Sequence, residues 1–214
     1  MVRINVQFKL LAYVLLMGAL VAFVPDQKGD KKKKSSKSGL DEAAEFKAQV
    51  AGYRKDCKAA LKPYRYSFGR TTYFNYKSYN TLKEVEVALI LNSSYKFTFN
   101  AEGVTVDPIQ VKVYNKPSNY NKRILLFEKN SVSGGSFEFT SEQLVEKMKE
   151  NYREKGLSDY ELEKILLSKV YIDYIIPAID EEFEEDESTG RRKVIVKRGA
   201  IVFASGYENL VMDD

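Results

Sequence analysis

Residues 64–79 are the stretch in which side-chain types and spacing best suit binding chemistry, because aromatic and basic residues are interleaved there. Aromatic rings stack on nucleobases, sugar rings or protein side chains, while the cations between them pair with phosphates or carboxylates. The stretch therefore predicts a contact surface for a protein, a glycan or single-stranded nucleic acid, unless its rings form strands that pack into the core. The candidate binding residues are Tyr64, Arg65, Tyr66, Arg70, Tyr73, Phe74, Tyr76 and Tyr79.

Groups that carry out catalysis are scarce in this sequence. There is no His, which removes the commonest general base near neutral pH and the commonest metal ligand. The single Cys57 excludes an intrachain disulfide and a Cys-cluster zinc site. Glu84 and Glu86 could form a glycosidase-like carboxylate pair, but they alternate with apolar residues as on any exposed strand face. We therefore expect a non-enzymatic protein with no cofactor and no metal.

The acidic run of residues 180–187 contains seven carboxylates among eight residues. Calcium-binding loops place oxygen ligands at alternating positions around a glycine-driven turn, and that pattern is missing here. We interpret the run as a solvated loop, and its charge could pair with residues 191–193 or with the N-terminal lysines of another copy. The sequence leaves Ca²⁺ binding by this run open.

Three runs of alternating apolar and polar residues form the centre of the predicted fold. They occupy residues 85–91, 95–99 and 109–113, with turn residues between them. Such alternation is typical of half-buried antiparallel strands. Further strands are predicted at residues 104–106, 123–128 and 136–140, with one or two more in residues 64–80 on either side of Gly69. The total of about seven strands is in the range of a β-sandwich.

The order of patterns in residues 82–140 is an apolar strand, a turn, a strand with alternating aromatics, and an Asp-led apolar strand ending in Tyr at residues 107–114. This order resembles the exported jelly-roll accessory domains of bacteria known as the prepeptidase C-terminal type. A helix pattern follows where that family usually has a final Gly-x-Tyr strand. The resemblance implies a jelly-roll fold and a non-catalytic accessory role in a bacterial surface or secreted protein.

A helix is predicted before this core, at residues 40–62. Its apolar residues form one stripe, Ser38 is its predicted cap, and Pro63 stops it. Cys57 lies on that stripe, so we expect a small core residue and not a nucleophile. The stripe consists of Phe46, Val50, Tyr53, Cys57 and Leu61.

Two helices are predicted after the core, at residues 141–155 and 158–170, the second opened by a capping box of Ser158 and Glu161. Residues 171–176 are dense in β-branched and aromatic side chains and could instead form a strand. Residues 193–196 and 200–205 predict a C-terminal β-hairpin.

The N-terminal residues have the pattern of a secretory signal, since a start containing Arg3 and Lys9 precedes fifteen apolar residues at 10–24. That run is short for a membrane span, but the lysines directly after it are unusual for a simple export signal. Residues 1–24 are thus either a signal peptide or an uncleaved anchor. Residues 25–39 read as a Lys/Ser-rich disordered linker.

The sequence as a whole predicts a mainly β protein with helical additions (α+β), built on an antiparallel, jelly-roll-like β-sandwich. Residues 63–140 form this core and residues 141–214 carry the helical pair, acidic loop and hairpin. The expected role is an exported interaction or cell-envelope structural module in the periplasm, on the outer surface or secreted, with a protein partner. The alternatives are a glycan-binding module that uses residues 64–79, or a membrane-anchored part of a larger envelope assembly. Export argues against nucleic acid, and membrane contact requires that residues 10–24 remain uncleaved.

Overall fold

The computed structural model of the chain describes residues 34–186 and 190–209. The predicted signal or anchor and the first part of the predicted linker lie outside these residues. The chain divides into two units, residues 1–43 and 44–214, and of the first unit only the start of one helix is described. All packing discussed below lies within the second unit.

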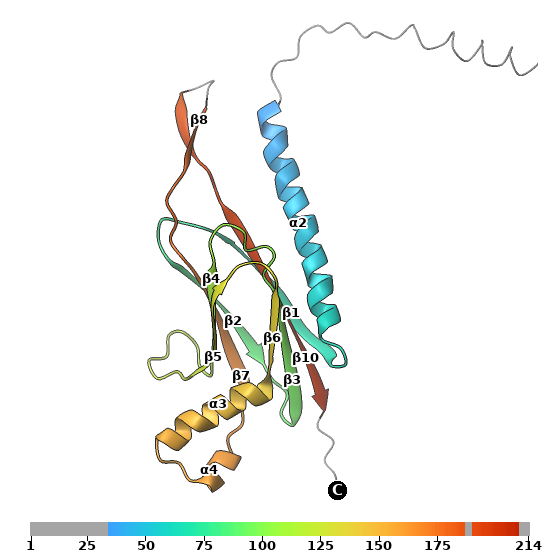
Figure 1. The fold of residues 1–214 in the computed structure, drawn as a ribbon, viewed down its shortest axis with the longest axis vertical. Coiled ribbons are helices and arrows are strands. Elements are labelled where there is room, and N and C mark those ends of the chain that lie inside the picture. Colours follow the sequence, from blue (N-terminus) through green and yellow to red (C-terminus); the bar gives the residue numbers. More distant parts are fainter. Residues whose placement is uncertain (1–33, 187–189, 210–214) are drawn as a thin grey trace, which may run out of the picture. The chain divides into compact units, whose positions relative to one another are not determined.

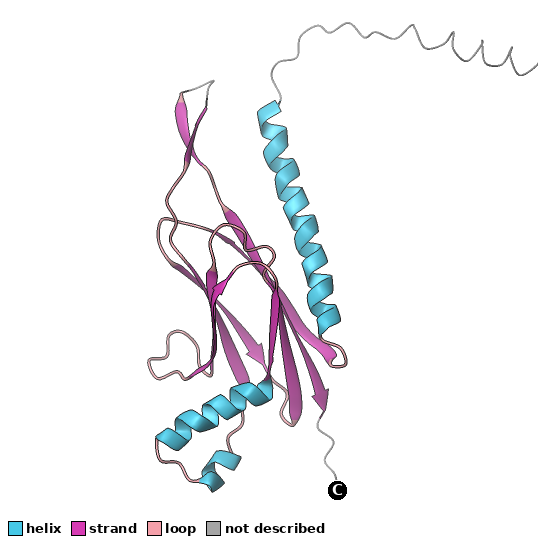
Figure 2. Ribbon diagram, viewed as in Figure 1, coloured by secondary structure: helices cyan, strands magenta, loops and turns pink. Residues whose placement is uncertain are grey.

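Two four-stranded sheets form the body of this unit (Figures 1 and 2). The first has the order β1 (Arg65–Asn75), β10 (Arg198–Asn209), β3 (Ser93–Asn100) and β6 (Ser136–Thr140). The second has the order β2 (Thr81–Ala88), β7 (Lys169–Ile176), β4 (Ile109–Tyr114) and β5 (Leu125–Val132). All these pairings are antiparallel, and strands that alternate between two sheets in this order make a jelly roll. The predicted fold class is confirmed.

The alternating apolar residues of the strands fill the space between the two sheets. Phe97 and Phe99 of β3 are fully buried, and so are Val111 and Val113 of β4 and Ile172 of β7. Each such side chain stabilises the fold by about 1.5–3 kcal/mol relative to leaving it in water. The period-2 pattern therefore identified the core face of these strands correctly.

Helix α2 (Lys34–Ala60) packs its apolar stripe against the outer face of β10. Val50 and Cys57 contact a row of small β10 side chains, Ala200, Val202 and Ala204. These small residues let the helix lie close to the strand, and the predicted stripe is confirmed. The helix begins at Lys34, so residues 34–39 of the predicted disordered linker are helical.

The helical pair after the core is shorter than predicted. Helix α3 (Ser141–Glu154) is followed by α4 (Asp159–Glu163), whose predicted capping box is confirmed because Glu161 accepts hydrogen bonds from both the backbone and the side chain of Ser158. The predicted continuation of the second helix to residue 170 is wrong. Residues 169–176 form β7, which pairs with β2 and β4 on its two sides, so the alternative interpretation of residues 171–176 as a strand is confirmed.

The predicted hairpin of residues 193–196 and 200–205 is also wrong. Strand β9 (Arg191–Val194) pairs with β8 (Phe183–Asp186), while β10 pairs with β1 and β3. The C-terminal hairpin is therefore β8–β9, and β10 is a buried central strand of the first sheet. The jelly-roll core thus extends beyond residues 63–140, because β7 and β10 each supply a central strand.

Two smaller predictions also differ from the structure. Residues 104–106 are irregular and do not form a strand, and residues 65–75 form one strand that runs through Gly69. A Cβ atom at Gly69 would lie 2.8 Å from the Tyr66 hydroxyl and 3.3 Å from the Phe203 carbonyl oxygen. A side chain at this position would require the half-exposed Tyr66 ring to move, and Gly69 does not interrupt the strand.

None of the described helices combines the length and the apolar composition that a membrane span requires.

Candidate functional site

The structure separates the eight predicted binding residues into core and surface. Phe74 and Tyr76 are buried, whereas Tyr66, Tyr73 and Tyr79 remain 47%, 45% and 57% exposed. The two predicted arginines, Arg65 and Arg70, are exposed and Tyr64 is half-buried. Within β1 the neighbours Tyr73 and Phe74 follow the strand period, since successive side chains point to opposite faces of the sheet.

The two buried rings have a structural role. The Tyr76 hydroxyl donates a hydrogen bond to the Asp107 carbonyl oxygen at 2.6 Å, and the Tyr76 ring meets Phe74 edge-on with 5.4 Å between centroids. Burial raises the pKa of Tyr76, and the bond to Asp107 offsets only part of that effect. These two side chains hold the end of β1 against the sandwich and are not part of a surface site.

The outer face of β1 is shared with helix α2. The Lys58 ammonium lies 4.7 Å from the centroid of the Tyr66 ring, and Phe46 meets the Tyr73 ring edge-on at 6.4 Å. The Arg54 guanidinium donates a hydrogen bond to the Thr71 hydroxyl at 2.6 Å. The exposed rings of β1 are thus positioned by helix side chains and keep about half of their surface exposed to solvent.

β1 is also an edge strand, with β10 as its only hydrogen-bonded neighbour among the described strands. At 11 residues it is longer than the other three edges of the two sheets, β6 with five residues and β2 and β5 with eight each. An edge strand presents a row of unpaired backbone donors and acceptors that can pair with another strand. Four of the predicted surface residues, Arg65, Tyr66, Arg70 and Tyr73, therefore lie on the longest of these four sheet edges.

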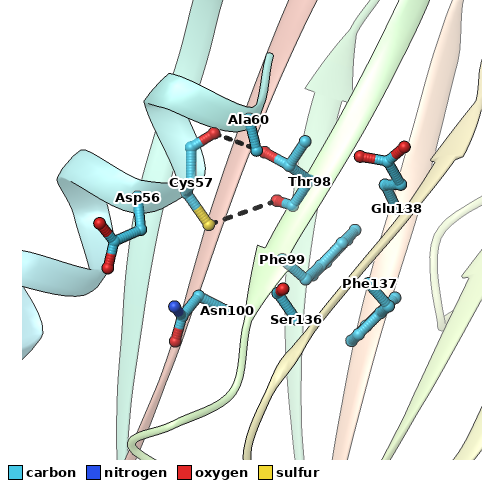
Figure 3. A pocket seen from close by; sticks show the side chains of 9 residues that line it. All are labelled: Asp56, Cys57, Ala60, Thr98, Phe99, Asn100, Ser136, Phe137 and Glu138. Atoms are coloured by element: carbon cyan, nitrogen blue, oxygen red, sulfur yellow. Dashed lines mark hydrogen bonds between the residues drawn. The ribbon is translucent and has the colours of Figure 1, made fainter.

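A groove of about 240 Å³ lies between α2 and the outer face of β3 and β6 (Figure 3). Cys57 points into it from the helix, where its thiol contacts the Thr98 carbonyl oxygen at 3.8 Å and its own carbonyl accepts a hydrogen bond from the Thr98 hydroxyl at 3.0 Å. Burial raises the pKa of the Cys57 thiol to about 11, so it is protonated at neutral pH. Cys57 is therefore a core residue, as predicted, and its thiol is not an activated nucleophile.

Glu84 and Glu86 make separate structural contacts. Glu86 pairs with Lys169 at 2.6 Å, and a Glu84 carboxylate oxygen accepts a hydrogen bond from the Ser118 backbone amide at 2.6 Å. Glu84 thereby holds the loop between β4 and β5 against the second sheet. This arrangement does not resemble two carboxylates that face one substrate.

A buried carboxylate on the second sheet was not identified from the sequence. The Asp173 side chain is 1% exposed, and one of its oxygens lies 2.6 Å from the Arg123 guanidinium while the other has no hydrogen-bond partner. Burial raises the pKa of Asp173, as does Glu84 on the neighbouring strand, and Arg123 opposes both. Arg123 also stacks on the Tyr114 ring at 3.7 Å, so this cluster closes the loop of residues 115–123 onto the sheet.

The described part of the acidic run makes ordinary polar contacts. Glu181 accepts a hydrogen bond from the Ser78 hydroxyl at 3.0 Å, and Glu182 forms an ion pair with Lys197. Among the described residues, no group of three or more His, Cys, Asp or Glu side chains lies close enough to hold a metal ion. Position 187, the end of the run, lies outside the described residues.

No protein-family model matches this chain, and no curated protein matches it either. Nine chains of known structure do match. One of them, described as "CBM4 structure and function", has a TM-score of 0.31 and 15% sequence identity, and the match covers 69% of this chain and 80% of that chain. A likeness at this level carries no information about what this chain binds. The fold of the chain itself supports the resemblance to jelly-roll accessory domains only as far as a β-sandwich.

Proposed function

We propose that this chain is an exported, non-enzymatic jelly-roll module that binds an extended segment of a protein partner along the open edge of β1. The observation that carries the proposal is that the longest sheet edge coincides with the aromatic and basic stretch of residues 64–79. In strand addition, backbone hydrogen bonds supply affinity and alternate side chains supply specificity. The role agrees with the accessory function that the resemblance implies, in the cell envelope or outside the cell.

The side chains of β1 determine which segments it would accept. Tyr66 and Tyr73 favour aromatic or β-branched neighbours across the strand, since each such cross-strand pair contributes about 0.2–1 kcal/mol. Arg65 and Arg70 are exposed on the same strand and favour carboxylates. The expected partner segment therefore alternates acidic with apolar residues.

The same features protect the edge from unselective pairing. The register of β1 against β10 shifts between Tyr66 and Phe68, and such a bulge bends an edge away from flat strands. The two arginines repel basic segments. The bulge and the two arginines of this long edge strand therefore suit a surface that accepts only selected strands.

The test is hydrogen exchange on the full chain with a synthetic peptide that alternates Glu and Val and is long enough to pair with β1 throughout. We expect this peptide to slow amide exchange in residues 65–75. A peptide that alternates Lys and Val should not slow it. The double variant Arg70→Glu and Tyr73→Ser should lose the effect. The matched control Tyr160→Ser, which removes a 68% exposed ring from α4, should keep it.

Three outcomes would contradict the proposal: no protection of β1, equal protection by both peptides, or equal loss in the Tyr160 control. Each would show that the edge and its side chains do not select a strand.

A glycan-binding module is the second candidate, because the exposed rings of Tyr66, Tyr73 and Tyr79 could stack on sugar rings. A glycan array distinguishes glycan binding from strand addition. Hits that disappear in Tyr73→Ser and persist in Tyr160→Ser would favour glycan binding, whereas an empty array would leave strand addition as the function.

Export is tested separately, by mass spectrometry of the native N-terminus together with cell fractionation. A start near Phe23 in the periplasmic or secreted fraction supports a cleaved signal. An intact Met1 in the membrane fraction supports an anchor at residues 10–24, and an intact Met1 in the cytosol would refute export.

A further inference from the structure

The β8–β9 hairpin carries a second exposed surface that the proposed function does not use. Its strands pair Phe183 with Val194, Glu184 with Lys193 and Glu185 with Arg192. Directly opposed residues of an antiparallel pair lie on the same face, and successive residues alternate. Phe183, Val194, Glu185 and Arg192 therefore share one face, which we call the Phe183 face, and the pair Glu184–Lys193 lies on the other.

The Phe183 face is apolar at its base and charged further along. Phe183 is 52% exposed and Val194 is 44% exposed, and both Glu185 and Arg192 are exposed as well. A two-stranded hairpin is only marginally stable in water unless something packs on it. A contact that covers this apolar pair would remove it from water, which favours an interaction on the Phe183 face.

We propose that a second copy of this chain covers the Phe183 face, so that two hairpins stack with their acidic strands over each other's basic strands. The charge pattern selects this occupant, because on each hairpin the acidic strand β8 lies beside the basic strand β9. A twofold axis parallel to the strands places β8 of one copy over β9 of the other. Phe183 then meets the partner's Val194, and Glu185 meets the partner's Arg192.

Other symmetric pairings of the hairpins oppose like charges. Edge-to-edge pairing about a twofold axis perpendicular to the sheet would join β8 to β8 or β9 to β9. Stacking about an axis across the strands would place β8 over β8. Like charges directly opposed are destabilising. Only the axis parallel to the strands therefore brings the apolar residues of the two copies together and also places opposite charges over each other.

The size of the face sets the expected strength. Two short strands bury less than the roughly 1,000 Å² that a stable interface requires, so the dimer belongs to the weak, transient class. Because Glu185 and Arg192 are exposed, the association should also weaken as salt is added.

The experiment measures the dimerisation constant of the full chain by sedimentation equilibrium, for the native protein and for Glu185→Arg and Arg192→Glu separately. Each single variant carries like charges on the Phe183 face, so its self-association should weaken about tenfold or more. Mixing the two variants should restore a dimer, because the two faces then carry opposite charges. In this heterodimer each chain still has two like charges facing each other across its own hairpin. Restored association would therefore show that the charges act between the two copies and not by loosening the hairpin within one chain.

The matched control is Glu184→Arg, which makes the same charge change on the opposite face and should leave the dimerisation constant unchanged. Phe183→Ser should abolish association. The proposal is overturned if the native chain is monomeric at every concentration reached, if the mixed variants fail to associate, or if Glu184→Arg weakens the dimer as much as Glu185→Arg does.

Discussion

Tyr76 is the residue at which the structure and a surface interpretation of residues 64–79 make opposite predictions. Its ring is 6% exposed, it packs edge-on against Phe74, and its hydroxyl donates to the Asp107 carbonyl oxygen at 2.6 Å. Replacement by Phe removes only the hydroxyl, which should cost about 1 kcal/mol and up to about 3 if the carbonyl oxygen stays buried without a donor. Replacement by Ala also removes the ring and should cost about 3–5 kcal/mol.

The comparison is with Tyr79→Ser, which changes a ring that is 57% exposed. Such a surface substitution should alter stability by no more than about 0.5 kcal/mol. Urea unfolding followed by circular dichroism measures all three variants, provided that the slope of the unfolding free energy against urea stays constant. The reasoning is refuted if Tyr76→Ala costs less than about 1 kcal/mol, or if Tyr79→Ser costs as much as Tyr76→Phe.

Two further predictions concern buried ionisable groups. Burial raises the pKa of Cys57 from 9.0 to about 11, so its thiolate population near pH 8 is lower by about 100-fold in the folded chain. Alkylation by iodoacetamide should therefore be slower by at least that factor in the folded chain than in urea. Equal alkylation rates would show that the thiol is accessible in the folded chain. Burial, and Glu84 after it, raises the pKa of Asp173 above 3.8 despite Arg123, so the folded state binds this proton more tightly than the unfolded state does. The resulting stabilisation is complete below pH 3.8 and is lost as the pH rises through the folded pKa. Asp173→Asn should therefore gain stability relative to the native protein between pH 4 and pH 7 in urea melts, and a constant or falling difference would contradict this assignment.

The candidate surface could be predicted from the sequence only as a list of residue types. The alternating aromatic residues at 64–79 predicted one or two strands on either side of Gly69, which the structure shows as the single strand β1, but they did not indicate which rings point inward. That division depends on the register of β1 against β10, a strand more than a hundred positions away in the chain. Phe74 lies opposite Gly199, whose missing side chain leaves room for the ring, and no local pattern contains that information.

The buried cluster of the second sheet was missed for the same reason. Asp173 stands inside a run of β-branched and aromatic residues, which is an unusual place for a carboxylate and was the one available signal. Its role depends on Glu84 on a neighbouring strand and on Arg123 from a loop. Three separate segments had to meet before the carboxylate could be recognised as a structural tie.

The sequence by itself determined the features that arise within one segment. The apolar stripe of α2, the burial of Cys57, the capping box at Ser158 and the alternation of β3 and β4 all follow from local periodicity and hydrogen bonding. Only the tertiary structure decided what depends on partners distant in the chain. β7 and β10 each became a central strand of their sheet because each gains hydrogen bonds on both edges and burial of its apolar side chains. The same long-range pairing left β1 at an edge, where Arg65, Tyr66, Arg70 and Tyr73 remain exposed.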